Sequence, residues 1–329
     1  MLAPRPFGPT GRSVTPIGFG AWAIGGTWGE VTEADAAAAL NAALDAGVDF
    51  LDTADVYGDG RSERIIAKVL STRSGPRPYV ATKAGRRITP HIAENYTRAT
   101  LEAHIDRSRA NLQMDCLDLV QLHCPPSPVY DSARVFDAMT AICDTGKIAN
   151  FGVSVERIDE AEKAIRYPGV ISVQIIYNLF RQRPAETFFA AAAARNVAII
   201  ARVPLASGLL SGKMTAETAF AADDHRSFNR DGAAFDKGET FSGVPYDVAL
   251  EAVEALRPLI PQGTTMAAFA LRWILMEQAV TVVIPGARNA AQATGNAAAL
   301  SVPPLSPETM DAARTLYTRL IAPHVHTSW

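Results

Sequence analysis

Short apolar segments alternate with helix-forming segments along almost the whole chain. The apolar segments show no regular exchange of polar and apolar side chains, which is typical of strands that are buried on both faces of a sheet. We expect strands at 16–20, 48–51, 79–83, 117–122, 148–153, 171–175, 197–201 and 280–284. Because a helix-forming segment follows each of them in turn, the order predicts an α/β protein built as a (β/α)8 TIM barrel rather than an open sheet.

The second half of the chain adds segments that a minimal barrel does not need. Residues 203–245, after the seventh strand, are rich in Gly, Asp and Arg and are too long for an ordinary connection, so we expect a functional loop. A C-terminal helix at 306–321 leads to a tail with His324 and His326, which we expect to be mobile rather than a metal site. No change of composition divides the chain, so we expect a single domain over residues 1–329.

The composition argues against several classes of partner. Hydrophobic residues make up 48% and charged residues 20% of the 329 residues, and the net charge is −3, so nothing favours nucleic acid or an anionic membrane. No segment resembles a signal peptide or a membrane span. Cys116, Cys124 and Cys143 are odd in number and lack metal-ligand spacing, so we expect reduced thiols, no metal and a cytoplasmic location.

Polar, titratable side chains stand at three consecutive strand ends. Asp52 and Tyr57 follow the second strand, Lys83 ends the third and His123 follows the fourth. Taken singly, each has an ordinary explanation as a loop cap, a solvated lysine or a satisfied core histidine. The carboxyl ends of barrel strands share one mouth, however, and this is where barrel enzymes carry their active groups. We therefore expect the four side chains to meet there.

Together these four side chains suit one kind of proton transfer. A phenol is a weak acid at neutral pH, and a nearby cation such as Lys83 eases the loss of its proton. Asp52 would keep Lys83 charged and aimed, while His123 would donate a hydrogen bond to a carbonyl oxygen. Such a group could protonate the alkoxide that forms when hydride is delivered to a carbonyl carbon.

The same residues lie in motifs that resemble those of a known family. Asp52-Thr-Ala-x-x-Tyr57-Gly, Ala81-Thr-Lys83 and Leu119-Val-Gln-Leu-His123 look like the catalytic motifs of the aldo-keto reductase superfamily. The resemblance continues in order through segments 146–154, 174–178, 204–213 and 284–296. It is closest to the bacterial branch of inositol-operon and general-stress reductases.

The resemblance implies an NADP(H) cofactor and the residues that hold it. The nicotinamide carboxamide would meet Ser154 and Gln174, segment 205–213 would cover the pyrophosphate, and Arg288 would bind the 2′-phosphate. The last assignment agrees with the residues themselves, because 285–288 opens a helix and a helix N-terminus with an arginine is a phosphate site. The expected cofactor residues are Ser154, Gln174, Arg202, Pro204, Leu205, Gly208, Leu210, Gly212, Lys213, Gly286, Arg288, Gln292 and Asn296.

Two positions depart from the family pattern. Val155 stands where many members have an asparagine beside the carboxamide, and Arg202 stands where many place an aromatic ring against the nicotinamide. A guanidinium plane can also stack on a ring, although its charge disfavours the oxidised nicotinamide. Trp22, Trp28 and Trp329 are expected to line the substrate pocket, with ordinary packing as the alternative.

These features together predict an NADPH-dependent reductase that converts an aldehyde or ketone to an alcohol, with Tyr57 as the general acid. A sugar or polyol dehydrogenase that uses NAD(P) is the alternative, since the direction of the reaction depends on the cofactor pool. A slow-turnover, NADPH-binding regulatory subunit is a third possibility. The substrate would be a small molecule, and the oligomeric state stays open between monomer and homo-oligomer.

Overall fold

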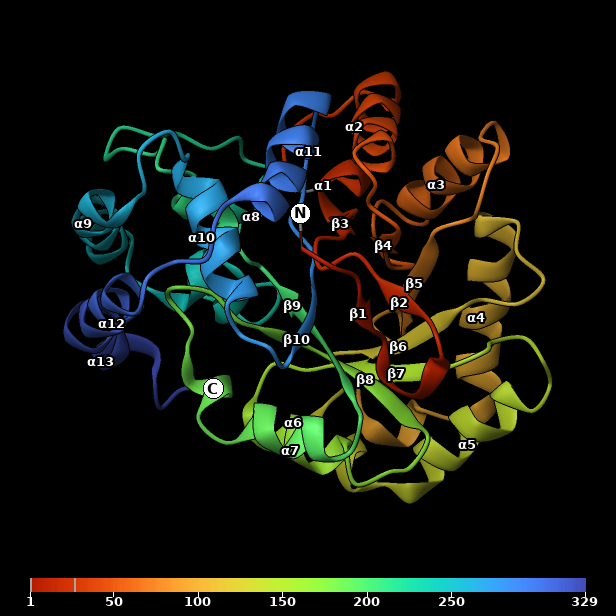
Figure 1. Cartoon of the computed structure of the whole chain (residues 1–329). Coiled ribbons are helices and arrows are strands. Elements are labelled where there is room, and N and C mark those ends of the chain that lie inside the picture. The colour runs from red at the N-terminus through yellow and green to blue at the C-terminus, as the bar shows by residue number, and fades with distance from the viewer. Residues whose placement is uncertain (1, 27) are drawn as a thin grey trace.

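The computed structural model describes residues 2–26 and 28–329, and it contains the expected barrel (Figure 1). Eight parallel strands form one sheet in chain order among these residues. They are β3 (Phe19–Gly20), β4 (Phe50–Asp52), β5 (Tyr79–Ala84), β6 (Leu119–His123), β7 (Phe151–Ser154), β8 (Val170–Ile176), β9 (Ala198–Arg202) and β10 (Val280–Val283). Parallel bridges from Ile17 to Val283 and from Gly20 to Gly286 join the two edges and close the barrel, so the fold prediction is confirmed.

An N-terminal hairpin, which the sequence did not predict, closes one end of the barrel. Its antiparallel strands, β1 (Arg5–Pro6) and β2 (Ser13–Val14), lie across the centre of the barrel in Figure 1. Phe7 from the hairpin is fully buried, with its ring centroid 5.4 Å from that of Phe50 and 5.1 Å from that of Tyr79. Because Phe50 and Tyr79 begin their strands, this apolar plug leaves only the opposite end, where the strands finish, open for a site.

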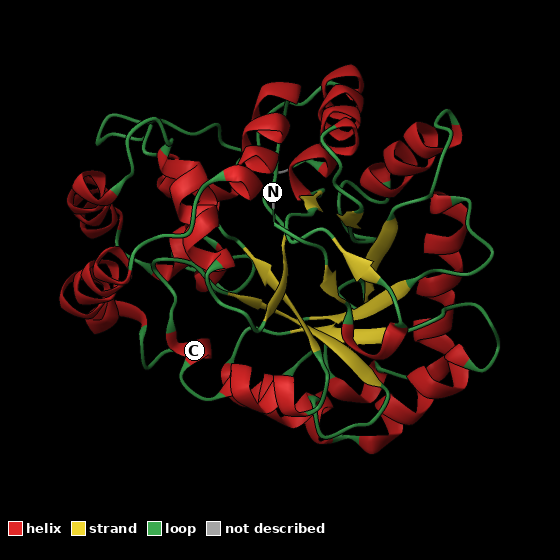
Figure 2. Cartoon of the chain, viewed as in Figure 1, coloured by secondary structure: helices red, strands yellow, loops and turns green. Residues whose placement is uncertain are grey.

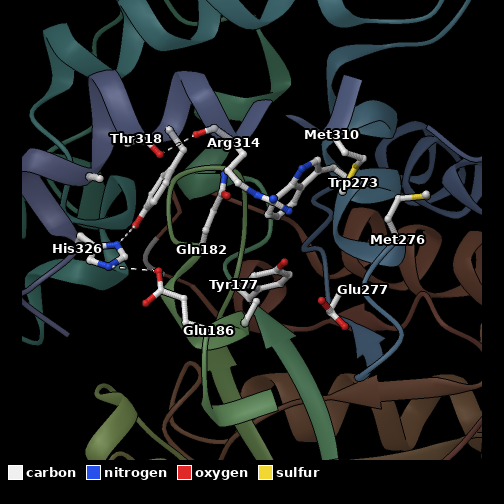
Figure 3. Close-up of a pocket in the computed structure, with 13 residues that line it drawn as sticks. Tyr177, Gln182, Glu186, Trp273, Met276, Glu277, Met310, Arg314, Thr318 and His326 are labelled. Atoms are coloured by element: carbon white, nitrogen blue, oxygen red, sulfur yellow. Dashed lines mark hydrogen bonds and ion pairs between the residues drawn. The ribbon is translucent and has the colours of Figure 1, made fainter. Parts of the chain in front are cut away.

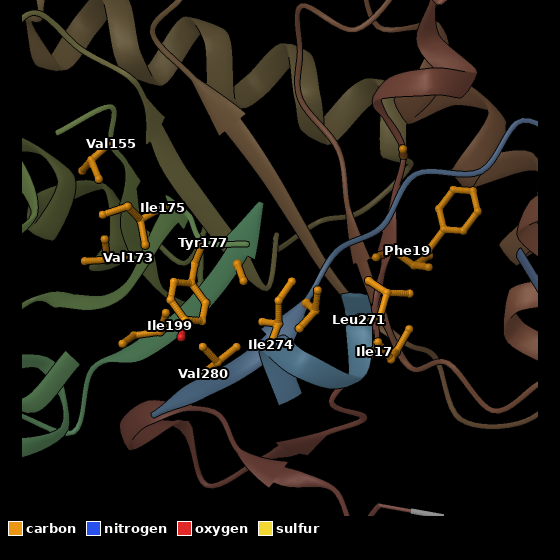
Figure 4. Packing of buried hydrophobic residues seen from close by; sticks show 14 of the residues in the cluster. Ile17, Phe19, Val155, Val173, Ile175, Tyr177, Ile199, Leu271, Ile274 and Val280 are labelled. Atoms are coloured by element: carbon orange, nitrogen blue, oxygen red, sulfur yellow. The ribbon is translucent and has the colours of Figure 1, made fainter. Parts of the chain in front are cut away.

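Helices surround the sheet, as Figure 2 shows. Those that lie outside the barrel wall are α2 (Glu33–Asp45), α3 (Arg61–Ser71), α4 (Arg98–Leu112), α5 (Ala133–Cys143), α6 (Ile158–Ala164), α7 (Phe188–Ala194), α10 (Met266–Leu275) and α11 (Ala290–Ala297). Their buried faces form a second apolar layer against the strands. Figure 4 shows part of it, where Leu271 and Ile274 of α10 pack toward strand residues such as Val280.

Two helices have ends set by local contacts. The α4 helix begins at Arg98, because Thr97 caps it by accepting a hydrogen bond from the Thr100 amide. The C-terminal helix ends its α-helical part early: α12 (Pro307–Leu316) passes into a π-helical turn (Tyr317–Ile321) and then into α13 (Ala322–Val325).

The expectation of a mobile histidine tail is wrong. The ring of His326 contacts two groups, with Nδ1 2.9 Å from the Tyr317 hydroxyl and Nε2 3.3 Å from a carboxylate oxygen of Glu186. The tail therefore packs against the C-terminal helices.

The long segment after β9 is a structured cover. It contains α8 (His225–Phe228) and short 3-10 helices at Ala206–Ser211, Lys237–Glu239 and Phe241–Gly243, and it leads into α9 (Tyr246–Leu256). Within the described residues, no helix combines the length and apolarity that crossing a membrane requires.

Candidate active site

The structure brings the four predicted catalytic residues together at the open end of the barrel. Asp52 ends β4, Lys83 lies near the end of β5, and His123 ends β6. The Lys83 ammonium donates to both carboxylate oxygens of Asp52, at 2.6 and 2.7 Å, and to the Thr53 carbonyl at 2.8 Å. The Tyr57 hydroxyl lies 3.3 Å from Lys83 Nζ. The short β4 strand and the turn after it thus deliver an acid and a phenol to one lysine.

Burial and charge set the protonation of Lys83 and Tyr57. Burial alone would lower the pKa of Lys83, but the Asp52 carboxylate and the Tyr57 oxygen raise that pKa above its ordinary value, so the lysine stays charged. Burial raises the pKa of Tyr57, and Lys83 offsets only part of that shift. Lys83 therefore acts to lower the pKa of the phenol, as expected, but burial raises that pKa by more. Tyr57 holds its proton at neutral pH and is ready to donate it.

His123 stands edge-on to Tyr57, with the ring centroids 5.9 Å apart. Burial lowers the pKa of His123 well below its ordinary value, and the cations of Arg86, Lys83 and Arg202 lower it further. Its Nδ1 atom has no hydrogen-bond partner among the described residues. The imidazole is therefore neutral, and it can offer an N–H to a carbonyl oxygen without adding a charge.

Ser154 and Gln174 extend this network from the neighbouring strands β7 and β8. The Gln174 amide donates to both carboxylate oxygens of Asp52, at 2.9 and 3.1 Å, and its own carbonyl accepts from the Ser154 hydroxyl at 3.4 Å. Asp52 is thus held by Lys83 and Gln174 together. Burial raises the pKa of Asp52 above its ordinary value, and the pairing with Lys83 and Gln174 opposes that shift in favour of the charged carboxylate.

An elongated cavity of about 560 Å³ begins at these residues. Asp52, Tyr57 and His123 line it, while Lys83 lies behind them. The tryptophans Trp22 and Trp28 line it as well. Of the expected cofactor residues, the lining includes Ser154, Gln174, Arg202, Pro204, Leu205, Gly208, Lys213, Gly286, Arg288, Gln292 and Asn296.

Three expected residues do not reach the cavity. Leu210 is fully buried in the apolar layer, and Gly212 has a φ of 70° and ends the 3-10 turn of the loop. Trp329 lies elsewhere: its indole N–H donates to the Asp236 carboxylate at 2.9 Å, and the guanidinium of Arg181 stacks over its ring. Leu210 and Gly212 were expected from the family resemblance and Trp329 from its place in the tail, but the 3-10 turn and the packing of the C-terminus keep all three out of the cavity lining.

Three further cations, Lys213, Arg226 and Arg288, line the cavity. Arg288 lies just before α11, and Arg226 stacks on the ring of Trp28, whose carbonyl accepts from Arg288. The Gln292 side chain accepts a hydrogen bond from the Arg288 amide at 2.9 Å, and Asn289 caps the helix. Arg226 was not predicted, because it lies in the irregular 203–245 segment and is aimed by its salt bridge to Asp224. This donor set fits a ligand with several phosphate groups.

A buried charge cluster lies near the catalytic end, and no sequence motif marked its central residue, Glu239. The Glu239 carboxylate contacts Arg86 at 2.7 Å and Arg202 at 3.4 Å. Burial would raise the pKa of Glu239, but the two arginines lower it to about 2. Arg202 also donates to the Val155 carbonyl at 2.9 Å, so its guanidinium is held on the cavity wall.

Cys124, Glu156 and Glu239 come close enough to resemble a metal site, with ligand atoms within 4.8 Å of one another. Arg86 pairs with both carboxylates, and burial raises the pKa of the Cys124 thiol to about 11. A protonated thiol and arginine-bound carboxylates are poor metal ligands, so the cluster reads as an ion-pair network.

A second cavity, of about 650 Å³, lies outside the barrel wall between α10 and the C-terminal helices (Figure 3). Tyr177, Trp273, Arg314 and His326 are among its lining residues. None of the predicted catalytic or cofactor residues contributes to it, although it is the larger of the two. The proton-transfer chemistry belongs to the cavity at the barrel mouth.

A closed barrel with a tyrosine, lysine, aspartate and histidine at its mouth is the architecture of an oxidoreductase. The chain belongs to the aldo/keto reductase family, because the sequence model of that family matches residues 16–318. This confirms the superfamily that the motifs indicated.

Relatives within the family carry several different descriptions. Aldo-keto reductase YhdN of Bacillus subtilis is 32% identical over 289 residues, which cover 86% of this chain and 84% of that protein. A probable voltage-gated potassium channel subunit beta of Oryza sativa is 30% identical over 322 residues, covering 92% and 93%. An aldo-keto reductase of Schizosaccharomyces pombe that is described as using NADP(+) is 26% identical over 300 residues, covering 88% and 85%. Among solved structures, glycerol dehydrogenase of Gluconobacter oxydans superposes with a TM-score of 0.79 at 25% identity, over 99% and 97% of the chains.

Proposed function

We propose that this protein reduces an aldehyde or ketone to an alcohol with NADPH, and that Tyr57 is the general acid. The observation that carries the proposal is a protonated phenol held 3.3 Å from a buried lysine, facing a cavity that three further cations, Lys213, Arg226 and Arg288, line. When bound, the cofactor supplies a hydride to the carbonyl carbon. All other steps fall to residues of this chain.

The proton steps follow from the charges at the site. His123 donates a hydrogen bond to the carbonyl oxygen and so holds it near Tyr57. As negative charge develops on that oxygen, the Tyr57 hydroxyl transfers its proton to it. The tyrosinate left behind is stabilised by the Lys83 ammonium, whose own charge is maintained by Asp52. The neutral imidazole does not compete with Tyr57 as an acid.

The cofactor assignments are part of the proposal. Ser154 and Gln174 would hold the carboxamide, and the cations Lys213, Arg226 and Arg288 would bind the phosphates. Arg288, beside the N-terminus of α11, is the candidate for the 2′-phosphate that distinguishes NADP(H) from NAD(H). We further propose that residues 1–329 act as one domain in the cytoplasm, within the branch of inositol-operon and general-stress reductases.

The first prediction tests the general acid. Tyr57→Phe should lower kcat for carbonyl reduction by about 10²- to 10⁴-fold, because only the proton donor is removed. The Kd for NADPH should stay within about twofold, since no phosphate contact changes. Stopped-flow absorbance at the nicotinamide band measures the first quantity, and quenching of tryptophan fluorescence measures the second. Carbonyl reduction at the wild-type rate would show that the mechanism is wrong.

A sugar or polyol dehydrogenase is the second candidate. Glu239, which lines the cavity and pairs with Arg86 in the buried charge cluster near the catalytic end, suits a hydroxylated substrate better than a purely apolar one. The likeness to a glycerol dehydrogenase agrees with this. Assays of both directions over matched pairs, an aldose and its polyol beside an aliphatic aldehyde and its alcohol, separate the two. A protein that binds NADPH tightly yet turns over none of these would instead favour a regulatory subunit.

A further inference from the structure

Tyr57 lies in a turn with a strained backbone. Gly58, Asp59 and Gly60 have φ angles of 59°, 53° and 83°, so three successive residues are in the left-handed region. Asp59 pays a steric cost there that glycine does not. Hydrogen bonds at 3.0–3.3 Å hold the local shape of the turn; they run from the amides of Tyr57, Asp59, Arg61 and Ser62 to the carbonyls of Ala54, Val56, Gly58 and Tyr57. Because these bonds join only residues of the turn itself, its placement against the rest of the barrel, and so the direction of the phenol, depends on contacts from outside.

One side of the turn is fixed by close backbone packing on α1 (Trp22–Gly25). A Cβ atom on Gly25 would lie only 2.6 Å from the Tyr57 Cβ, so the backbone of α1 and the backbone of the turn are in direct contact. Arg61 secures α1 in turn, because it donates to the Ile24 carbonyl at 2.6 Å and to the Val31 carbonyl at 2.6 Å. This contact stops the Tyr57 turn from moving toward α1, but it does not stop the turn from moving away from α1.

The turn is also held by Arg107 of α4. One guanidinium nitrogen donates to the Asp55 carbonyl at 3.2 Å. The other donates to the Asp59 carbonyl at 3.0 Å and to the Asp59 carboxylate at 2.6 Å. Asp55 and Asp59 stand two residues before and two residues after Tyr57. A single planar group thus bridges the beginning and the end of the turn that carries the phenol.

The Asp59 carboxylate is a shared anchor in this bridge. Arg87, which follows β5, donates to the same oxygen at 2.5 Å. These hydrogen bonds and charges hold the pKa of Asp59 below its ordinary value, so the anchor keeps its charge at neutral pH. Only a guanidinium has the fork of donors that reaches two carbonyls at once, whereas a lysine ammonium is a point charge on a flexible stem.

We propose that Arg107 is a positioning residue for the reaction, which acts by holding the Tyr57 turn against α1 so that the phenol stays aimed at the substrate oxygen. The proposal rests on the proposed role of Tyr57. Arg107 does not line the cavity and does not touch the phenol, so its effect passes through the backbone of the turn.

The second prediction tests this bridge with Arg107→Ala and Arg107→Lys. Arg107→Ala should lower kcat by about 10- to 100-fold, since a displacement of about 1 Å in the acid has that effect. The Kd for NADPH should stay within about twofold, because the phosphate contacts are remote. Arg107→Lys should recover part of the loss. The primary deuterium isotope effect on kcat, measured with NADPH deuterated at the transferred position, should rise as the chemical step becomes limiting.

Arg98→Ala is the matched control. Arg98 lies on the same helix, its side chain is 51% exposed, and its one ion pair within residues 2–26 and 28–329 is with Glu102 at 3.7 Å. This variant should keep the wild-type kcat and isotope effect. A wild-type kcat in Arg107→Ala would overturn the proposal, and so would a loss that is matched by weaker NADPH binding, since that pattern indicates general damage. If Arg107→Ala does not fold, Arg107→Lys decides by the same measurements.

The Tyr57→Phe variant separates this proposal from the function on which it rests. Adding Arg107→Ala to Tyr57→Phe should cause no further loss of kcat, because the bridge has no phenol left to aim. A further tenfold loss would mean that Arg107 acts by another route. If Tyr57→Phe itself keeps the wild-type rate, the general-acid mechanism fails, whatever Arg107→Ala does.

Discussion

At the scale of single residues, the site depends on how each buried charge is paired. Lys83 and Asp52 are both about 1% exposed, and each is satisfied by the other and by a further partner, Thr53 or Gln174. Asp55, three residues from Asp52, shows the opposite situation. It is fully buried, and no side chain among the described residues hydrogen-bonds to either of its carboxylate oxygens.

The third prediction concerns the pH dependence that Asp55 creates. Burial and the neighbouring Glu63 carboxylate raise the pKa of Asp55 to about 7, although Arg87 and Arg107 oppose the shift. The folded protein therefore binds this proton more tightly than the unfolded chain does. As the pH rises from about 4 to 7, the free energy of unfolding therefore falls progressively. The total loss from this one group reaches about 4 kcal/mol above pH 7.

Asp55→Asn removes this titration, so it should stabilise the protein relative to the wild type by about 3 kcal/mol more at pH 8 than at pH 5. Urea unfolding of the variant and the wild type at both pH values measures the difference between their free energies of unfolding. Other titrating groups, such as Glu156, contribute equally to both proteins and cancel. Asp59→Asn is the contrasting variant, because folding lowers the pKa of Asp59 whereas it raises the pKa of Asp55. A gain from Asp55→Asn that is equal at both pH values would rule out titration of this carboxyl.

The fourth prediction concerns Arg288 and the choice of cofactor. Arg288→Ala should weaken NADPH binding by about 10- to 100-fold, which is the usual worth of a charge-assisted hydrogen bond. NADH binding should change by less than about threefold, because that cofactor lacks the 2′-phosphate. Arg288 also donates to the Trp28 carbonyl at 3.0 Å, and the NADH measurement controls for any disturbance of that segment. Equal losses for both cofactors would contradict the assignment.

At the scale of elements, the two ends of the barrel have separate tasks. The β1–β2 hairpin fills one end with apolar rings and carries no catalytic group. The segment 203–245 covers the other end and supplies Glu239 and Arg226 to the cavity wall. It is anchored by several polar contacts, such as the Asn178 amide donating to the Val203 carbonyl at 2.8 Å and to the Ser242 hydroxyl at 2.9 Å. Stability and chemistry can therefore be changed independently.

The fifth prediction uses this separation. Phe7→Ala should lower the free energy of unfolding by about 3–5 kcal/mol, because it leaves a cavity among Phe50 and Tyr79. The kcat of the folded fraction should stay near the wild-type value, since the plug lies at the end opposite to Tyr57. Ile92→Ala, at a side chain that is 44% exposed, should cost well under 1 kcal/mol. A large loss of kcat in folded Phe7→Ala would contradict the division between the two ends.

At the scale of the whole molecule, the barrel mouth gathers residues that are remote in the chain. Arg86 and Glu239 are 153 positions apart, and Asp52 and Gln174 are 122 apart, yet each pair is hydrogen-bonded. Parallel strands in chain order explain this, because every strand ends at the same rim. The residues that end a strand could be predicted from the chain, whereas those carried by irregular segments could not.

The strand–helix order, the closed barrel and the meeting of Asp52, Tyr57, Lys83 and His123 all followed from local patterns, since apolar runs mark strands and strand ends share a mouth. Other features were decided only by the tertiary structure. Leu210 and Gly212 belong to the segment that the family resemblance assigns to the cofactor, but Leu210 turns into the core and Gly212 ends the 3-10 turn. Glu239, Arg226 and Arg107 carry no local signature, because their roles consist of contacts with residues brought near by the fold. Long-range pairing of side chains leaves no period or motif in a single sequence.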